Sequence, residues 1–349
     1  MHPRWSLISV SLGFILLVSS APLIPQPRDE GSCPVPFPRL ESQRLTEDDG
    51  WGTGAAFWNF LSIEDEKSGG TPAFSAKGVH SGQAFLFNHT SLQNNSADIL
   101  SLESADLHSF HRYRVIDSTV YPWNTIGRIF FQRFKGDKGG WCTGTLVGRS
   151  TMLTASHCFP WGYGSYRWMR FIPGYGYGNQ SEPFGGSHVS QCRGIRNTHN
   201  VTGVDYVICQ LCEPLGDTVG WMGTRWWDND SKYLHRPWFS SGYPVNTGHG
   251  QVQIFLTNLT LDNVDPHRDL GVELESQVFA SPGWSGGPLW GYIDGQPSVV
   301  GVCSGAEKSC SEQPGGCYMG NDNEPYHDVS AGGKLMVELV DYGKTHWDA

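Results

Sequence analysis

The chain has 349 residues, nine cysteines and a formal net charge of −10 at pH 7, and 13% of its residues are aromatic. Nucleic acids are bound by clustered basic side chains, and this acidic sequence has no such cluster. The composition therefore excludes a nucleic acid as the expected partner.

The first 21 residues have the pattern of a secretory signal peptide. A basic start with His2 and Arg4 precedes an apolar run over residues 7–18 and the small residues Ser19, Ser20 and Ala21. This run is shorter than the ~20 apolar residues that a membrane-spanning helix needs, and no later segment approaches that length. We therefore expect a soluble, secreted, extracellular protein with no membrane partner.

Sequons and cysteines agree with an extracellular location. Nine cysteines in an oxidising compartment favour disulfides over metal sites. Asn-X-Ser/Thr sequons predict a glycoprotein. Their acceptors are Asn88, Asn94, Asn179, Asn200, Asn229 and Asn258.

Residues 22–114 differ in composition from the rest of the chain. They are Pro-rich at first and then acidic and rich in Ser and Asn, with only short apolar runs. Such a segment folds weakly or stays partly disordered, so we interpret it as a leader. A boundary after Arg114 leaves Cys33 in the leader and the other eight of the nine cysteines behind it. That even number supports the boundary.

Beyond Val115, short apolar runs alternate with turn residues. Examples are TIGRIFFQRF, GTLVGRSTMLTAS, VDYVICQL and PSVVGVCSG. Runs of this length, rich in Val, Ile, Thr and aromatic residues, predict strands, and their regular spacing predicts an all-β sandwich or barrel. Near the end, Leu335 and Leu339 are four residues apart, as are Met336 and Val340. That spacing predicts a C-terminal helix over about 332–344.

Three stretches supply the side chains of an acyl-transfer site. His157 lies in TASHCF, Asp205 in GVDYVICQL and Ser285 in GWSGGP. A serine hydroxyl needs a nearby base to become a nucleophile, and the imidazole needs a carboxylate to hold its tautomer. The N–H groups of Gly283 and Ser285 would stabilise the oxyanion by roughly 3 to 4 kcal/mol each. Glycine at 283 tolerates the backbone shape that this requires.

These stretches and their neighbours carry a family resemblance. VIDSTVYPWNTIGRI, WCTGTLVGRSTMLTASHC, DYVICQLCEPLGDTVGWMG and PGWSGGP resemble the chymotrypsin-like serine proteases over about two thirds of the chain. Within that family they look most like the bacterial glutamyl endopeptidase branch and its fungal secreted relatives. The resemblance implies a zymogen with a signal peptide and a propeptide over 22–114. It also implies two six-stranded antiparallel β-barrels, over about 115–212 and 213–330.

The resemblance also implies a disulfide between Cys142 and Cys158. The remaining six cysteines of this region allow fifteen connectivities, which the sequence does not resolve. They are Cys192, Cys209, Cys212, Cys303, Cys310 and Cys317.

Two positions depart from the family pattern around the nucleophile. Trp284 stands where trypsin-like enzymes have the Asp that receives the new N-terminus. In the glutamyl endopeptidase branch the freed N-terminus lies near the acidic side chain of the substrate, so Val115 is the candidate for that role. The His that this branch usually has in a GVH context is replaced by Cys303 in VVGVCSG.

The base of the predicted substrate pocket also lacks an acid. Phe279 and Ala280 stand where trypsin-like enzymes hold an Asp for Lys or Arg substrates. With Cys303 and Val115 they form the predicted pocket, which does not favour basic substrates. A preference for acidic residues before the scissile bond stays open.

The overall prediction is a secreted, monomeric serine endopeptidase that cleaves proteins or peptides through an acyl-enzyme and needs no metal or organic cofactor. The alternative is a catalytically inactive binding protein of the same fold, although no member of the triad is replaced. Paired cysteines in CQLC at 209–212 resemble zinc ligands, but no second pair with suitable spacing follows.

Overall fold

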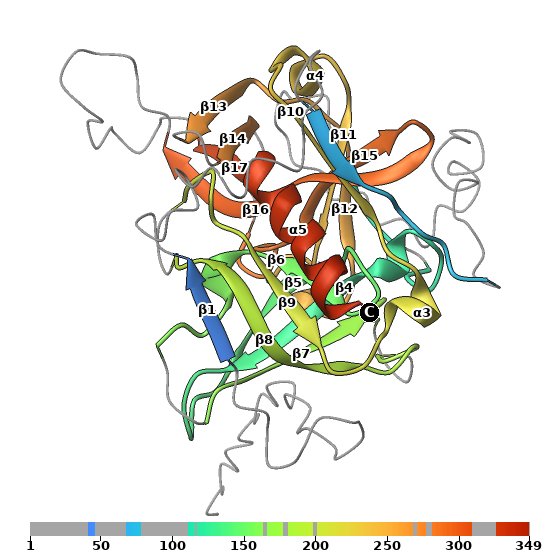
Figure 1. Ribbon diagram of the computed structural model, residues 1–349, viewed down its shortest axis with the longest axis vertical. Helices are drawn as coiled ribbons and strands as arrows, with labels where there is room; N and C mark the ends of the chain where they lie inside the picture. Colours follow the sequence, from blue (N-terminus) through green and yellow to red (C-terminus); the bar gives the residue numbers. More distant parts are fainter. Residues whose placement is uncertain are drawn as a thin grey trace, which may run out of the picture.

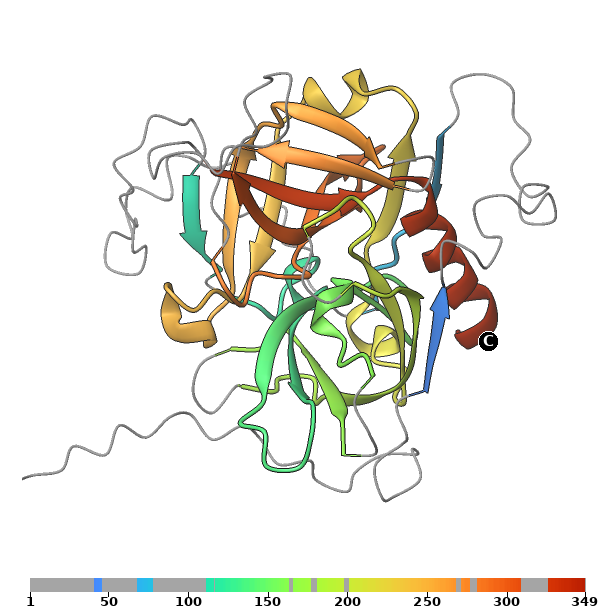
Figure 2. The same cartoon turned by 90° about the vertical axis from the view of Figure 1, so that its left-hand side faces the viewer.

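The computed structural model describes residues 41–45, 68–77, 111–115, 117–162, 166–176, 181–197, 201–267, 271–276, 281–308 and 326–348. The predicted signal peptide lies outside these ranges. So do Phe279, Ala280, Cys33, Cys310, Cys317, Asn88, Asn94, Asn179 and Asn200. The described chain is mainly β, with two sheets stacked one above the other and a long C-terminal helix along one side (Figures 1 and 2).

Six strands of the first sheet close into a barrel. Their order is β8-β7-β4-β5-β6-β9, and β8 also pairs with β9 to complete the ring. Most residues of these strands are buried; in TMLT, for example, all four residues are buried, two of them threonines. The strands are β4 (Ile126–Gln132), β5 (Gly140–Leu146), β6 (Thr151–Thr154), β7 (Trp168–Pro173), β8 (Ser187–Ile195) and β9 (Val207–Leu211). This closed barrel agrees with the first predicted barrel.

The second sheet has the order β13-β14-β17-β16-β15-β11-β12-β3, and β10 joins it by pairing with β16. No pairing among the described residues closes this sheet, so the second six-stranded barrel stays a prediction. Its strands are β10 (Gly223–Trp227), β11 (Trp238–Gly242), β12 (Ile254–Leu259), β13 (Asn263–His267), β14 (Gly271–Ser276), β15 (Pro288–Ile293), β16 (Gln296–Lys308) and β17 (Tyr326–Gly332).

Helix α5 (Lys334–Trp347) links the two sheets. It contacts β6 and β9 of the barrel and β10 and β14 of the second sheet. Leu335, Met336, Leu339 and Val340 are buried on its inner face, so the helix predicted from their spacing is confirmed. Two short helices are α3 (Gly216–Val219) and α4 (Ser231–Leu234). None of the helices in the described ranges is long and apolar enough to span a membrane.

Three strands come from the segment interpreted as a leader. β1 (Glu41–Leu45) pairs in parallel with β8. β2 (Ser68–Thr71) is antiparallel to β10, and β3 (His111–Arg114) is antiparallel to β12. These strands are four or five residues long, too short to show an alternating pattern in the sequence. Each of these strands is held in place by backbone hydrogen bonds to a strand of the rest of the chain.

The cysteines correct one step of the sequence analysis. Disulfides join Cys142 to Cys158 and Cys192 to Cys209, and the second of them links β8 to β9 within the barrel. Cys303 is free and buried. Seven of the eight cysteines after Arg114 therefore remain for pairing. Because seven is odd, the parity argument for a boundary after Arg114 is wrong.

Candidate active site

The barrel positions His157 at the end of one of its strands. A single 3-10 turn, Ser156–Cys158, follows β6 and carries the imidazole outward. The turn is held on both sides, because Ser156 Oγ donates to Ile195 O at 2.5 Å and Cys158 is bound to Cys142. The His157 side chain is 24% exposed, so a substrate can reach it.

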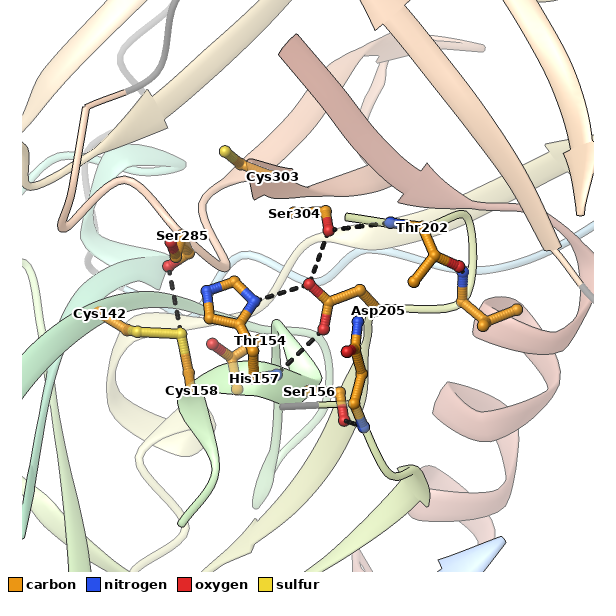
Figure 3. Close-up of polar contacts among 12 residues, drawn as sticks. Cys142, Thr154, Ser156, His157, Cys158, Thr202, Asp205, Ser285, Cys303 and Ser304 are labelled. Carbon is orange, nitrogen blue, oxygen red and sulfur yellow. Dashed lines mark hydrogen bonds and ion pairs between the residues drawn. A yellow bond between two sulfur atoms is a disulfide. The ribbon is translucent and has the colours of Figure 1, made fainter. Parts of the chain in front are cut away.

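Asp205 lies fully buried directly beside His157. Its Oδ2 is 2.6 Å from His157 Nδ1, and its Oδ1 accepts from the backbone N–H of His157 at 3.0 Å. Ser304 Oγ, from β16 of the second sheet, donates to the same Oδ2 at 2.6 Å (Figure 3). A carboxylate against Nδ1 keeps the proton on that nitrogen, which leaves Nε2 free to accept one.

Ser285 lies in the loop between β14 and β15, and the barrel holds this loop through Thr143 of β5. Thr143 N donates to Ser285 O at 2.9 Å, and Thr143 Oγ1 donates to Gly283 O at 2.8 Å. Figure 3 shows the imidazole of His157 between Asp205 and Ser285, with its second nitrogen on the Ser285 side. Within the described residues this nitrogen makes no hydrogen bond to the Ser285 hydroxyl. Such bonds often tighten only when substrate binds.

The backbone before Ser285 has the shape of an oxyanion site. Gly283 has φ +94°, and a Cβ there would lie 2.4 Å from Tyr243 O and 2.6 Å from Trp141 Nε1. Any other residue would therefore be strained and would clash. In the described part of the chain, the N–H groups of Gly283 and Ser285 have no acceptor. Both donors are available to a ligand.

Trp284, which replaces the Asp of trypsin-like enzymes, is part of the core. Its side chain is 2% exposed, and Nε1 donates to Ser240 Oγ at 2.9 Å. The residue next to the nucleophile therefore anchors this loop to β11 by packing and one hydrogen bond. It offers no carboxylate to a new N-terminus.

A group of possible metal ligands surrounds His157, but its chemistry does not suit a metal. The sulfurs of Cys142 and Cys158 and one ring nitrogen of His157 lie within 4.8 Å of one another. Because the two sulfurs form a disulfide, neither can act as a thiolate ligand. The imidazole is left as the one usable ligand of this group.

The structure places two of the predicted pocket residues. Cys303 is buried, with Sγ 3.9 Å from Oδ1 of Asp328 on β17. Burial, followed by the carboxylates of Asp328 and Asp205, raises the pKa of the Cys303 thiol well above its usual range. Val115 is also buried, and its N–H donates to Gln253 O at 2.9 Å. Phe279 and Ala280 lie outside the described residues.

Three residues of the site were missed by sequence reasoning: Thr143, Ser304 and Asp328. Thr143 and Ser304 hold the nucleophile loop and the Asp205 carboxylate through long-range hydrogen bonds. Short polar side chains in strands are common, so nothing local in the sequence marks these two. Asp328 is a carboxylate among buried residues of a strand. Because carboxylates are seldom buried without a partner, an Asp in such a strand could have been recognised as a candidate site residue.

Two of the predicted glycosylation acceptors are described. Asn258 is exposed at the end of β12, with φ +58°. Asn229 is partly buried, and its Oδ1 accepts from the N–H and the hydroxyl of Ser231 at 3.0 and 2.6 Å. Ser231 is the hydroxyl residue of the same sequon and the first residue of α4, so the sequon forms a compact turn at the start of this helix.

Comparison with known proteins identifies the family of the chain. The family model described as Trypsin matches residues 122–321, more than half of the chain. The chain belongs to the trypsin family. The serine endopeptidase class predicted from the sequence is confirmed at the level of this family.

One curated relative is the glutamyl endopeptidase of Bacillus licheniformis. It is 26% identical over 197 residues, which cover 55% of this chain and 57% of the relative. The chain thus spans somewhat over half the length of the curated relative that it matches. This similarity agrees with the branch that the sequence resembles.

Two solved structures are also similar to this chain. A Glu endopeptidase in complex with MPD is 19% identical, covers 67% of this chain and 97% of its own, and has a TM-score of 0.48. The protease Anisep from Arthrobacter nicotinovorans is 21% identical, covers 65% and 96%, and has a TM-score of 0.46.

Proposed function

We propose that this protein is a serine endopeptidase that hydrolyses peptide bonds through an acyl-enzyme. His157, Asp205 and Ser285 act as the triad, and Gly283 and Ser285 supply the oxyanion donors. The observation that carries the proposal is the contact between the buried Asp205 carboxylate and His157 Nδ1 at 2.6 Å. Beside it lies a nucleophile loop whose two N–H groups have no acceptor among the described residues.

In this mechanism Ser285 Oγ attacks the carbonyl carbon of the scissile bond while its proton passes to His157 Nε2. The negative charge that develops on the carbonyl oxygen is stabilised by the two N–H groups. Protonated His157, stabilised by Asp205, then gives its proton to the leaving amine as the C–N bond breaks. Water attacks the acyl-enzyme with His157 again as the base, which releases the acid and restores Ser285.

Replacing Ser285 with Ala tests this function. The variant should lose cleavage of a denatured protein substrate by about 10⁶-fold in kcat, and it should no longer react with a fluorophosphonate. Ser190→Ala is the matched control, since Ser190 lies on β8 and the bonds that its Oγ makes within the described residues are two weak ones to Gln210, at 3.2 and 3.3 Å. Equal cleavage by both variants would eliminate the mechanism. A wild-type protein that binds no fluorophosphonate would instead be the inactive binding protein.

The proposal includes a precursor. The chain is made with a signal peptide over 1–21 and a propeptide over 22–114, is secreted and N-glycosylated, and is cleaved before Val115. β3 ends at Arg114, and the N–H of Val115 donates to Gln253 O, a bond that the ammonium group freed by cleavage can also make. N-terminal sequencing of the active secreted form checks it, and a start well away from Val115 would contradict it.

The strands of the second sheet form the second barrel of this domain.

An acidic preference is the specificity that the resemblance implies, and it remains a prediction. One feature opposes it: a glutamate side chain entering near Cys303 would meet the Asp328 carboxylate, which lies 3.9 Å from Sγ. One feature could support it: the ammonium group of Val115, once it is freed by cleavage. Profiling cleavage sites in a mixed peptide library decides between a pocket that accepts glutamate and one that rejects it.

A further inference from the structure

Residues 68–77 precede the proposed cleavage site, yet they are built into the second sheet. β2 pairs with β10 along four residues, from Ser68 opposite Trp227 to Thr71 opposite Thr224. β2 lies at an edge, since β10 is its one partner among the described strands. Figure 1 draws this segment in light blue, and Figure 2 shows it on the same side of the molecule as α5. Among the described strands, removal of this segment would leave that edge of β10 without a partner.

The pairing is close enough to depend on small side chains. A Cβ on Gly70 would lie 2.3 Å from the backbone oxygen of Thr224. The next residue, Thr71, is buried, and its Oγ1 lies 2.9 Å from Thr224 Oγ1 while its N–H donates to the same hydroxyl oxygen at 3.3 Å. The strand therefore fits β10 through both backbone and side chain.

The residues after β2 continue the contact. Phe74 exchanges two backbone hydrogen bonds with Trp221, at 3.0 and 2.8 Å, and the two rings are 4.5 Å apart between centroids. Pro72 O accepts from Trp221 Nε1 at 3.2 Å and from Lys344 Nζ of α5 at 3.1 Å. Ala76 is 5% exposed. The segment thus occupies a surface made by Trp221, β10 and α5.

This surface also reaches the start of the proposed mature chain. Tyr121 Oη donates to Trp221 O at 3.0 Å, and that oxygen accepts from Phe74 N as well. Strand addition of this kind, with backbone bonds for affinity and an apolar side chain for fit, holds separate peptides onto sheet edges in many complexes. Cutting the chain elsewhere does not remove any of these contacts.

We propose that residues 68–77 stay bound after cleavage before Val115, so that the mature protease has two chains and the leader fragment supplies β2 as a permanent strand. This inference rests on the precursor cleavage given under the proposed function. In this proposal residues 68–77 are not discarded with the rest of the leader; they remain and stabilise β10 and α5.

The test separates retention of the segment from both maturation and activity. Recognition sites for a site-specific protease are placed within residues 46–67 and within 78–110 of full-length Ser285→Ala protein. Cutting both sites releases a peptide that holds residues 68–77 but neither Cys33 nor β3. The expected result is co-elution of this peptide with the rest of the protein in a 1:1 ratio by size exclusion and mass spectrometry. Separate elution, with an unchanged melting temperature of the remaining protein, would overturn the proposal.

Two variants examine the contact itself. Gly70→Ala introduces the clash with Thr224, and Phe74→Ala removes the ring contact with Trp221; each should release the peptide after cutting and lower the melting temperature. Ser75→Ala is the matched control, because Ser75 is exposed between the contacting residues, and it should retain the peptide. Equal retention by all three variants would show that β2 does not hold the segment. N-terminal sequencing of the natural enzyme reports separately on the cleavage before Val115.

Discussion

Replacing Asp205 with Asn probes the contact on which the proposed mechanism depends. The carboxylate accepts three hydrogen bonds, from His157 Nδ1 at 2.6 Å, His157 N at 3.0 Å and Ser304 Oγ at 2.6 Å. An amide has only one acceptor oxygen for these donors. If that oxygen replaces Oδ2, the new NH2 group faces the N–H of His157, and two donors oppose each other.

The other orientation is worse for catalysis. An NH2 group facing His157 Nδ1 forces this nitrogen to accept, so the ring proton moves to Nε2 and the base can no longer take the serine proton. In either orientation the charged imidazole loses its carboxylate. The same exchange in this type of triad lowers kcat by about 10⁴-fold, which corresponds to about 5.5 kcal/mol of transition-state stabilisation.

Ser304→Ala is the graded companion of that variant. It removes one of the two donors on Oδ2 but keeps the carboxylate. We therefore expect a loss of about 1 kcal/mol of transition-state stabilisation, which lowers kcat fivefold to tenfold. The assay is steady-state hydrolysis of a peptide substrate, with the concentration of active sites titrated and the melting temperature recorded for each variant. A folded Asp205→Asn enzyme with kcat within tenfold of wild type would refute the reasoning.

Three further predictions concern the oxyanion loop and the pocket. Gly283→Ala should lower kcat by about 10²- to 10³-fold, because the new Cβ meets Tyr243 O and displaces the oxyanion donor. Gly295→Ala is the control and should keep its activity, because Gly295 also has φ > 0 but a Cβ there would have no atom within 4 Å. Because burial raises the pKa of the Cys303 thiol, it stays protonated at pH 8 and should resist iodoacetamide until the protein is denatured; peptide mapping that finds it alkylated in the native protein would contradict this. Asp328→Asn removes a negative charge near Cys303 and should raise kcat/KM about tenfold for peptides with Glu before the scissile bond, relative to Ala; an unchanged ratio would place Asp328 outside the pocket.

Much of the first barrel was predictable because its strands carry their own signal. Segments such as β4 and β6 are short, apolar and bounded by turn residues, and α5 shows its buried face in the spacing of Leu335 and Leu339. The strands of the leader were not predictable. β2 reads SGGT, which has no apolar alternation, and it is ordered by the edge of β10 rather than by its own side chains.

The sequence by itself determined which residue types the chain offers for catalysis, since His157, Asp205 and Ser285 each stand in a recognisable local pattern. It also determined the all-β class, because strand periodicity is a property of neighbouring residues. Only the tertiary structure decided that Ser304 and Thr143 brace the site, that Cys303 stays unpaired and that residues 68–77 join the second sheet. Those contacts connect positions as far apart as Asp205 and Ser304, or Thr71 and Thr224. Their partners are brought together by strand pairing, which no local pattern encodes.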